Sequence, residues 1–174
     1  RPLIAPKGDT TRPTADRTRE TLFSMLTSRL GSFEGLQVLD LFSGSGALGL
    51  EALSRGAAHC VFVEQDKAAL DALETNIAKL GAGPQSEIKR GSALMLGPAR
   101  KAYDLILMDP PYGTGAGTVA LDKLSRLGWI ASGALVSIET GNREDTVVKG
   151  FEIDTTRDIG KARLTLLRPA SGSE

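Results

Sequence analysis

The sequence predicts an α/β fold in which a mixed seven-stranded sheet carries helices on both of its faces. Five short apolar runs alternate with helical patterns: QVLDLF (37–42), CVFVE (60–64), SEIK (86–89), DLILMD (104–109) and ALVSIE (134–139). Such alternation is typical of a parallel sheet whose strands are joined by crossover helices. Two further runs, FEIDTTRDIG (151–160) and KARLTLL (161–167), meet at the turn-like pair Gly160-Lys161 and predict an antiparallel hairpin that completes the sheet.

Two helices are indicated by apolar residues at spacings of three and four. Between the second and third strands, one such stripe predicts a helix that Gly81 ends, and it consists of Leu70, Leu73, Ile77 and Leu80. Ahead of the sheet, Thr14 is expected to cap a helix that runs to about Leu30 and stops at Gly31. The apolar face of this first helix holds Leu22, Met25, Leu26 and Leu30.

Length and cysteine content indicate one reduced, cytoplasmic domain. The chain has 174 residues and one cysteine, and no apolar run approaches the about 20 residues of a membrane span. We expect residues 1–174 to form a single domain, with an N-terminal arm and basic helix at 1–30 and an α/β core at 36–168. His59 and Cys60 cannot make a metal site by themselves, so we expect strand-edge and core roles for them and no metal. We also expect a monomer that does not bind membranes.

The first strand ends in a glycine loop that indicates a nucleotide-like cofactor. Gly44, Gly46 and Gly49 fit the pattern G-x-G-x-x-G, which alone does not distinguish a dinucleotide from other ligands. Asp40 ends this strand, and its carboxylate would repel a pyrophosphate but attract a cation. S-adenosylmethionine carries cationic ammonium and sulfonium centres, so Asp40 favours this cofactor over a dinucleotide.

Acids and small residues at the next strand ends complete the predicted cofactor site. Glu64 ends the second strand and is placed to accept hydrogen bonds from ribose hydroxyls, while Ser92 and Ala93 follow the third strand, where an adenine edge would lie. Glu64 could instead be an exposed strand-end acid, and Ser92 a plain helix cap. The full predicted cofactor-binding set is Asp40, Phe42, Ser43, Gly44, Gly46, Glu64, Gln65, Ser92, Ala93 and Asp109.

The DPPY stretch, residues 109–112, follows the fourth strand and predicts the catalytic centre. In a doubly wound sheet Asp109 would face the same crevice as the glycine loop. Pro110 and Pro111 lack N–H groups and make a stiff turn that offers only acceptors. The Asp109 carboxylate and the Pro110 carbonyl could hold an exocyclic amine with its lone pair aimed at the sulfonium methyl group. Tyr112 would stack on a base extruded from its helix or loop.

The sequence gives weaker evidence on which base is methylated than on the cofactor. A carboxylate matches the adjacent N1–H and N2–H donors of guanine, which favours guanine. Asp109 together with the Pro110 carbonyl could also accept both N6 hydrogens of adenine, so an adenine-N6 methyltransferase of RNA or DNA stays open.

The order of these blocks resembles a known family. TRPTADRTRETLF (11–23), DLFSGSGALGLEALSRGA (40–57), Glu64 and DPPY (109–112) are similar to the RsmD family of 16S ribosomal RNA (guanine-N2)-methyltransferases, over nearly the whole chain. The resemblance implies the Rossmann-like class I S-adenosylmethionine-dependent methyltransferase fold. It also implies methyl transfer to the N2 amine of one guanine in 16S rRNA, within the assembling 30S subunit. By the same match, the RNA-binding residues are Arg12, Pro13, Thr14, Arg17 and Tyr112.

Two features depart from the family pattern. Only RPLIAPKG (1–8) stands where members carry a basic strand segment, so we expect weaker anchoring of RNA. Ser92 replaces the Asp or Asn common at its position, so we expect looser binding of the cofactor.

Two rival functions share this scaffold. An NAD-dependent oxidoreductase would use the G-x-G-x-x-G loop but leaves Asp40 and DPPY unexplained. A non-catalytic RNA-binding module would retain the fold without turnover.

Overall fold

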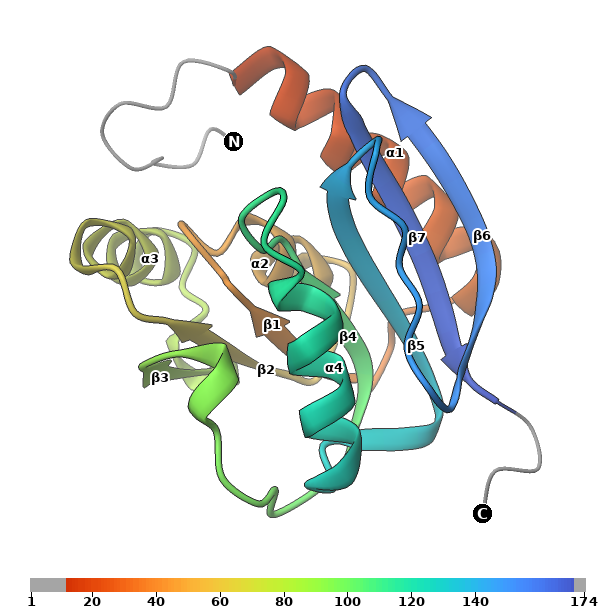
Figure 1. The fold of residues 1–174 in the computed structure, drawn as a ribbon. Coiled ribbons are helices and arrows are strands. Elements are labelled where there is room, and N and C mark those ends of the chain that lie inside the picture. The colour runs from red at the N-terminus through yellow and green to blue at the C-terminus, as the bar shows by residue number, and fades with distance from the viewer. Residues whose placement is uncertain (1–11, 171–174) are drawn as a thin grey trace.

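The computed structural model describes residues 12–170 of the chain (Figure 1). The segment RPLIAPKG lies outside the described residues, and for Arg12 and Pro13 only the backbone is described. The expected mixed seven-stranded sheet is confirmed, with its strands in the spatial order β3-β2-β1-β4-β5-β7-β6. The strands are β1 (Gln37–Leu41), β2 (His59–Glu64), β3 (Ser86–Arg90), β4 (Tyr103–Met108), β5 (Ile130–Gly141), β6 (Phe151–Ile159) and β7 (Ala162–Pro169).

The first five strands are parallel, and the hairpin adds two strands at one edge. β7 pairs antiparallel with both β5 and β6. The expected turn at Gly160-Lys161 therefore joins β6 to β7. β5 is longer than the run ALVSIE because Ile130 already pairs with Tyr103 before a register shift in β4.

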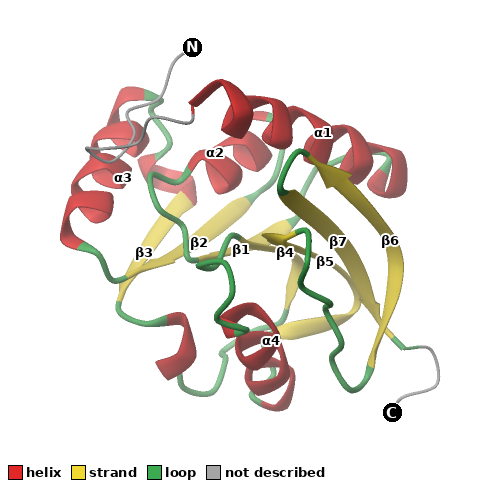
Figure 2. Ribbon diagram, turned by 45° about the horizontal axis from the view of Figure 1, so that its top comes forward, coloured by secondary structure: helices red, strands yellow, loops and turns green. Residues whose placement is uncertain are grey.

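Helices cover both faces of the sheet, as Figure 2 shows. The helices α1 (Arg12–Leu30), α2 (Ala47–Ser54) and α3 (Lys67–Lys79) lie on one face, and α4 (Ala116–Arg126) lies on the other. Two short 3-10 helices, η1 (Gly83–Gln85) and η2 (Ala93–Met95), flank β3. Each face has its own buried apolar cluster, because neighbouring residues of a strand point to opposite faces.

This alternation decides where the polar residues at the strand ends point. In β1, Val38 belongs to the cluster under α1, α2 and α3, and Leu39 and Leu41 belong to the cluster under α4. Asp40 therefore shares the face of Val38 and points toward α2. In β4, Leu107 lies on the α2 side and Met108 on the α4 side. Continued alternation directs Asp109 to the α2 side.

The first helix starts earlier than the sequence predicts. We expected Thr14 to cap it, but α1 begins at Arg12, and the carbonyl oxygen of Thr14 accepts a hydrogen bond of 3.0 Å from the Thr18 hydroxyl. Pro13 is compatible with this start, since a proline in the first turn lacks only an N–H that has no helical partner. The predicted end is correct: Gly31 has a φ of 72° and its N–H bonds to the carbonyl of Thr27.

The other sequence-predicted core positions agree with the structure. Leu70, Leu73 and Ile77 of α3 are buried, and Gly81, with a φ of 66°, follows the end of the helix. Cys60 is buried in the core, and His59 is a partly buried residue at the start of β2.

Candidate active site

The glycine loop and the DPPY turn lie next to each other at the carboxyl edge of the sheet. β1 and β4 are parallel neighbours, and Leu41 pairs with Met108 in their register. Phe42 and Asp109 are therefore the first residues beyond two adjacent strand ends. This register brings two segments together that are nearly 70 residues apart in the sequence.

Asp40 is buried beneath the glycine loop, with only 1% of its surface exposed. Its Oδ2 accepts a hydrogen bond of 2.9 Å from the N–H of Gly49 in the first turn of α2. The helix is capped by Gly46, which has no side chain to offer, so Asp40 supplies the acceptor from β1 instead. Burial raises the pKa of Asp40 well above its ordinary value, with the charges of Asp109 and Glu64 adding to the effect and the Gly49 bond opposing it. Because Asp40 is buried, it would influence a bound cofactor through the loop and helix start that it holds in place.

The three glycines of the loop serve different purposes. Gly44 has a φ of 57°, and no atom lies within 4 Å of the position that a Cβ would take, so its backbone is open to a ligand. A Cβ on Gly46 would stand 2.3 Å from Cδ1 of Leu73, and one on Gly49 would stand 2.5 Å from the ring of Phe62. Gly46 and Gly49 thus let α2 pack closely against the sheet. Only Gly44 matches the role of leaving room for a cofactor.

Glu64 fixes the glycine loop to the end of β2. One carboxylate oxygen accepts a hydrogen bond of 2.7 Å from the N–H of Gly44, and the other accepts from the N–H groups of Gln65 and Asp66. The Ser43 hydroxyl donates to the carbonyl of Asp40 at 2.6 Å and accepts from the N–H of Val63. Glu64 therefore orders the loop; its role toward ribose hydroxyls stays a prediction.

Two further features of this loop did not stand out in the sequence. Asn76 of α3 is completely buried, and its amide Nδ2 donates a hydrogen bond of 3.0 Å to the carbonyl of Ser45. In the sequence, this contact was indicated by the position of Asn76, a polar residue directly before Ile77 of the apolar stripe of α3. Phe42 has a φ of 56°, a conformation that costs a non-glycine residue about 1 kcal/mol or more. The loop is thus held in a strained, well-anchored shape.

Ser92 and Ala93 lie at the end of β3, where the preceding Gly91 donates its N–H to the carbonyl of Glu64. The Ser92 side chain caps η2 by accepting a hydrogen bond of 3.1 Å from the N–H of Leu94. Ala93 is buried. A role as a helix cap is the alternative that the sequence analysis left open for Ser92. The hydroxyl hydrogen of Ser92 is still able to donate a hydrogen bond to a ligand.

The carboxylate of Asp109 has no hydrogen-bond or ion-pair partner within residues 14–170. Asp109 is partly exposed to water, while the surrounding protein removes much of the water around its carboxyl group. Removal from bulk solvent, together with the charge of Glu139, raises the pKa of Asp109 to about 7. The carbonyl oxygen of Pro110 likewise accepts no hydrogen bond from this part of the chain. Two free acceptors therefore stand next to each other in the DPPY turn.

Glu139 is the principal site residue that the sequence analysis missed. It lies one position beyond Ile138, which pairs with Met108, so Asp109 and Glu139 are neighbours at adjacent strand ends. Glu139 accepts a hydrogen bond of 2.6 Å from the hydroxyl of Tyr112, and burial raises its pKa. Burial and this bond also raise the pKa of Tyr112. An acid at the end of the fifth strand, like Glu64 at the end of the second, was the signal in the sequence.

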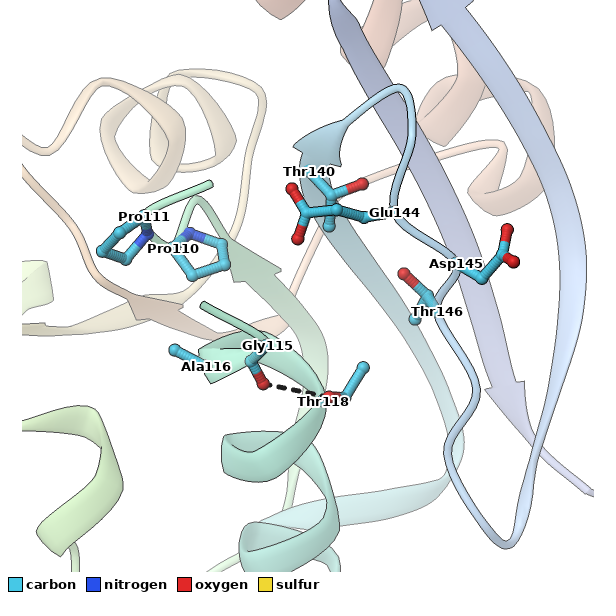
Figure 3. Close-up of a pocket in the computed structure, with 10 residues that line it drawn as sticks. Pro110, Pro111, Gly115, Ala116, Thr118, Thr140, Glu144, Asp145 and Thr146 are labelled. Carbon is cyan, nitrogen blue, oxygen red and sulfur yellow. Dashed lines mark hydrogen bonds between the residues drawn. The ribbon is translucent and has the colours of Figure 1, made fainter. Parts of the chain in front are cut away.

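Glu144 ties the DPPY turn to the end of β5. Its Oε2 accepts hydrogen bonds from the N–H groups of Gly113 and Gly141, at 2.9 and 2.8 Å. Figure 3 shows Glu144 and Thr140 on one side of a small pocket of about 30 Å³, with Pro110 and Pro111 on the other. This pocket has room for about one water molecule and not for a base.

The segment GTGAGT after Tyr112 is partly helical. Gly113, Thr114 and Gly115 form the turn, and Ala116 begins α4. The Thr114 hydroxyl donates to the carbonyl of Pro111 at 2.8 Å.

A larger cleft of about 690 Å³ opens on the other side of Tyr112. Its walls come from the DPPY turn, from the turn after β5 and from the tip of the β6–β7 hairpin, and they include Tyr112, Gly141, Asn142, Arg143, Glu144 and Lys161. Tyr112 has 48% of its surface exposed, so a face of its ring is available to a stacking partner.

Of the RNA-binding residues predicted on α1, Thr14 and Arg17 are exposed. Nη2 of Arg17 lies 3.9 Å from the position of a Cβ on Gly160, at the tip of the hairpin. The side chains of Arg12 and Pro13 lie outside the described part of the structure. Arg17 is thus at the same end of the molecule as the cleft.

Two kinds of feature are absent from the described residues. There is no group of three or more His, Cys, Asp or Glu side chains that could hold a metal ion. None of the described helices has the length and apolar character needed to cross a membrane.

Comparison of the sequence with known proteins identifies a matching family and several relatives. The profile of the family described as "Conserved hypothetical protein 95" matches residues 1–168. The chain is 38% identical over 140 residues to "Ribosomal RNA small subunit methyltransferase D" of Escherichia coli strain K12, which covers 80% of this chain and 69% of that protein. It is 40% identical over 116 residues to "Putative rRNA methyltransferase YlbH" of Bacillus subtilis strain 168, and this match covers 64% of this chain and 61% of that protein.

Structural comparison gives the same grouping. "Putative methyltransferase yhhF" from Escherichia coli matches with a TM-score of 0.84 and 32% identity over 98% of this chain and 93% of the other. Magnesium protoporphyrin IX methyltransferase of Synechocystis PCC 6803, solved with bound S-adenosylmethionine, matches with a TM-score of 0.70 and 17% identity over 91% and 81%. The second likeness concerns the fold alone. The predicted Rossmann-like class I methyltransferase fold is confirmed.

Proposed function

Because the chain belongs to the RsmD family of ribosomal RNA small subunit methyltransferases, we propose that it methylates the exocyclic N2 amine of a guanine in 16S rRNA. It is an S-adenosylmethionine-dependent methyltransferase that acts on small-subunit ribosomal RNA. The proposal also has finer parts. They are the choice of guanine and of its N2 amine, a substrate within the assembling 30S subunit, a cytoplasmic location, and action as a monomer that forms a single domain.

The observation that carries the proposal is the register of β1 with β4, which sets the glycine loop beside Asp109. Among the residues of the loop, Gly44 leaves its backbone open, and the carboxylates of Asp40 and Glu64 make the surroundings negative. This set of groups fits a cationic cofactor and disfavours a pyrophosphate. We assign Phe42, Ser43, Gly44, Gly46, Glu64, Gln65, Ser92 and Ala93 to the cofactor side of the site, with Asp40 acting through the loop and helix start that it holds in place.

When bound, S-adenosylmethionine supplies a methyl group on a positively charged sulfur. The chain's own residues position the acceptor. Asp109 and the carbonyl of Pro110 have free oxygens that can accept hydrogens of a base amine, while Pro111 keeps the turn stiff. Tyr112, held through its hydroxyl by Glu139, presents its ring to the base. Methylation releases a proton from the amine, and an Asp109 carboxylate with a pKa of about 7 is able to receive it.

Product analysis tests this proposal. The protein is incubated with labelled S-adenosylmethionine and, in parallel, with small ribosomal subunits, naked 16S rRNA and duplex DNA, and the methylated nucleoside is identified by mass. We expect N2-methylguanosine from one or both of the RNA substrates. N6-methyladenosine would replace guanine by adenine as the target, and transfer to duplex DNA alone would refute an RNA substrate.

An NAD-dependent oxidoreductase is disfavoured by the same geometry. The buried carboxylate of Asp40 lies under the loop that would have to hold a pyrophosphate. Calorimetric titration separates the two cofactors: heat from NADH and none from S-adenosylmethionine would overturn the assignment.

A further inference from the structure

The cleft beside Tyr112 is built by three segments that are far apart in the sequence. The turn after β5 is fixed to the tip of the β6–β7 hairpin, because the N–H of Asn142 donates to the carbonyl of Lys161 at 2.9 Å. The amide Nδ2 of Asn142 donates to the carbonyl of Gly160 at 3.2 Å. Arg17 of α1 approaches Gly160 from outside the sheet, and Figures 1 and 2 both show α1 beside the hairpin. The turn after β5 and the hairpin tip thus form one continuous rim of the cleft, and Arg17 lies next to this rim at Gly160.

Together with Arg17, this rim carries three cations that the protein itself does not neutralise. Arg17, Arg143 and Lys161 are exposed, and their side chains make no ion pair or hydrogen bond with the described residues. By contrast, Arg163 nearby is bonded to Asp158 at 2.8 Å and to Asp145 at 3.4 Å. Free cations that gather around a cleft are suited to binding an anionic ligand.

The inner wall of the site has the opposite charge. Asp109, Glu139 and Glu144 lie on the strand ends and turns that meet at Tyr112. Phosphate groups are repelled by this wall and attracted by the rim, whereas the N–H donors of a base edge are attracted by the carboxylates. The charge pattern therefore orients a nucleotide with its base directed inward and its phosphates on the rim.

We propose that the cleft binds the single-stranded RNA on either side of the target nucleotide, with Arg143 and Lys161 on its phosphates and Arg17 next to them. This inference rests on the proposed function and extends it from the reacting base to its neighbours. A volume of about 690 Å³ is enough for a nucleotide-sized ligand. An exposed aromatic ring bordered by cations is the usual arrangement of sites for single-stranded nucleic acid.

The dependence of methyl transfer on salt tests the inference. The variants are Arg143→Ala, Lys161→Ala and the double variant, and the substrate is naked 16S rRNA at several potassium chloride concentrations. We expect a higher KM for RNA with a similar kcat, and a slope of log kcat/KM against log salt that becomes shallower by about 0.7 for each lost phosphate contact. Lys161→Arg should restore the slope because it keeps the charge.

Arg100→Ala is the matched control. Arg100 is also exposed and has no partner among the described side chains, but it precedes β4 at the amino edge of the sheet. Its loss should leave KM and slope unchanged. An active wild-type enzyme with the same KM and slope in both single variants and in the double variant would overturn the inference alone. Failure of the wild-type enzyme to methylate any RNA would instead refute the proposed function.

Discussion

Replacing Glu139 by Gln should move the acidic limb of the pH profile of methyl transfer to lower pH. Asp109 must be ionised to accept hydrogens from the base amine, so activity should rise as the pH increases through its pKa of about 7 and level off above it. Burial is the larger cause of this raised pKa, and the negative charge of Glu139 is the second. Gln removes the charge but retains an oxygen that can accept the Tyr112 hydroxyl.

The size of the change follows from the two causes. The pKa of Asp109 is raised from its ordinary value of 3.8 to about 7, and the charge of Glu139 is the smaller of the two causes. We therefore expect the limb to move down by about one pH unit, as befits a like charge near a protein surface. Initial rates with 16S rRNA and saturating cofactor, taken well below and well above pH 7, measure the shift.

The control for this experiment is Glu152→Gln. Glu152 is an exposed acid near the start of β6, at the opposite end of that strand from the hairpin tip. The Glu152→Gln substitution removes the same unit of charge from the protein without changing the surroundings of Asp109. An acidic limb that stays in place in Glu139→Gln, or moves to higher pH, would refute the coupling of these two carboxylates.

Four further variants probe the site. The Asp109→Ala variant should bind S-adenosylmethionine in calorimetry as tightly as the wild-type protein. Its turnover should fall by at least about 100-fold, which is the usual effect of removing one electrostatic contact from a transition state. A turnover equal to that of the wild-type protein would refute the proposed role of Asp109 in holding the amine. Gly46→Ala should lower the free energy of unfolding in urea by about 3 kcal/mol, because its φ is 86° and its Cβ would meet a buried leucine at 2.3 Å. Gly44→Ala, with open space around it, should cost only about 1 kcal/mol, and equal losses in the two variants would contradict their different packing. Asn76→Ala should cost about 2 kcal/mol, since it leaves the Ser45 carbonyl without its bond, and should weaken cofactor binding; unchanged affinity would mean that it does not position the loop.

The charge arrangement around Tyr112 gives the two halves of the site different tasks. Asp109 and Glu139 are acids at neighbouring strand positions, where we propose that the donors of the base are held. Lys161 and Arg143 are cations that line the cleft, where we propose that the phosphate backbone passes. Neither group has an ion pair across the cleft in the described structure. The separation keeps both sets of charges available for the substrate.

The fold could be predicted from the sequence because its signals are local. Apolar runs of strand length, the stripe of Leu70, Leu73 and Ile77, and the turn at Gly160-Lys161 each lie within a few residues of one another. The start of α1 was wrong by three residues. A cap at Thr14 would make Ala15 the first helical residue, but α1 begins at Arg12, and the exact start of a helix depends on the surrounding fold. The strand-end position of Asp109 could also be predicted, because in a parallel sheet the carboxyl ends meet at one edge.

What the sequence alone determined is the kind of chemistry: a glycine loop, an acid before it, and a proline-stiffened acid at a second strand end. Only the tertiary structure decided how these groups are used. It buried Asp40 against the N–H of Gly49, set Glu139 beside Asp109 through the register of β5 with β4, and brought Lys161 and Arg143 to the cleft at Tyr112. Strand order can be inferred from a pattern of alternating strands and helices, but the exact register of two strands and the packing of turns depend on contacts between residues that are distant along the chain. For this reason the sequence did not single out Glu139, Arg143 or Lys161.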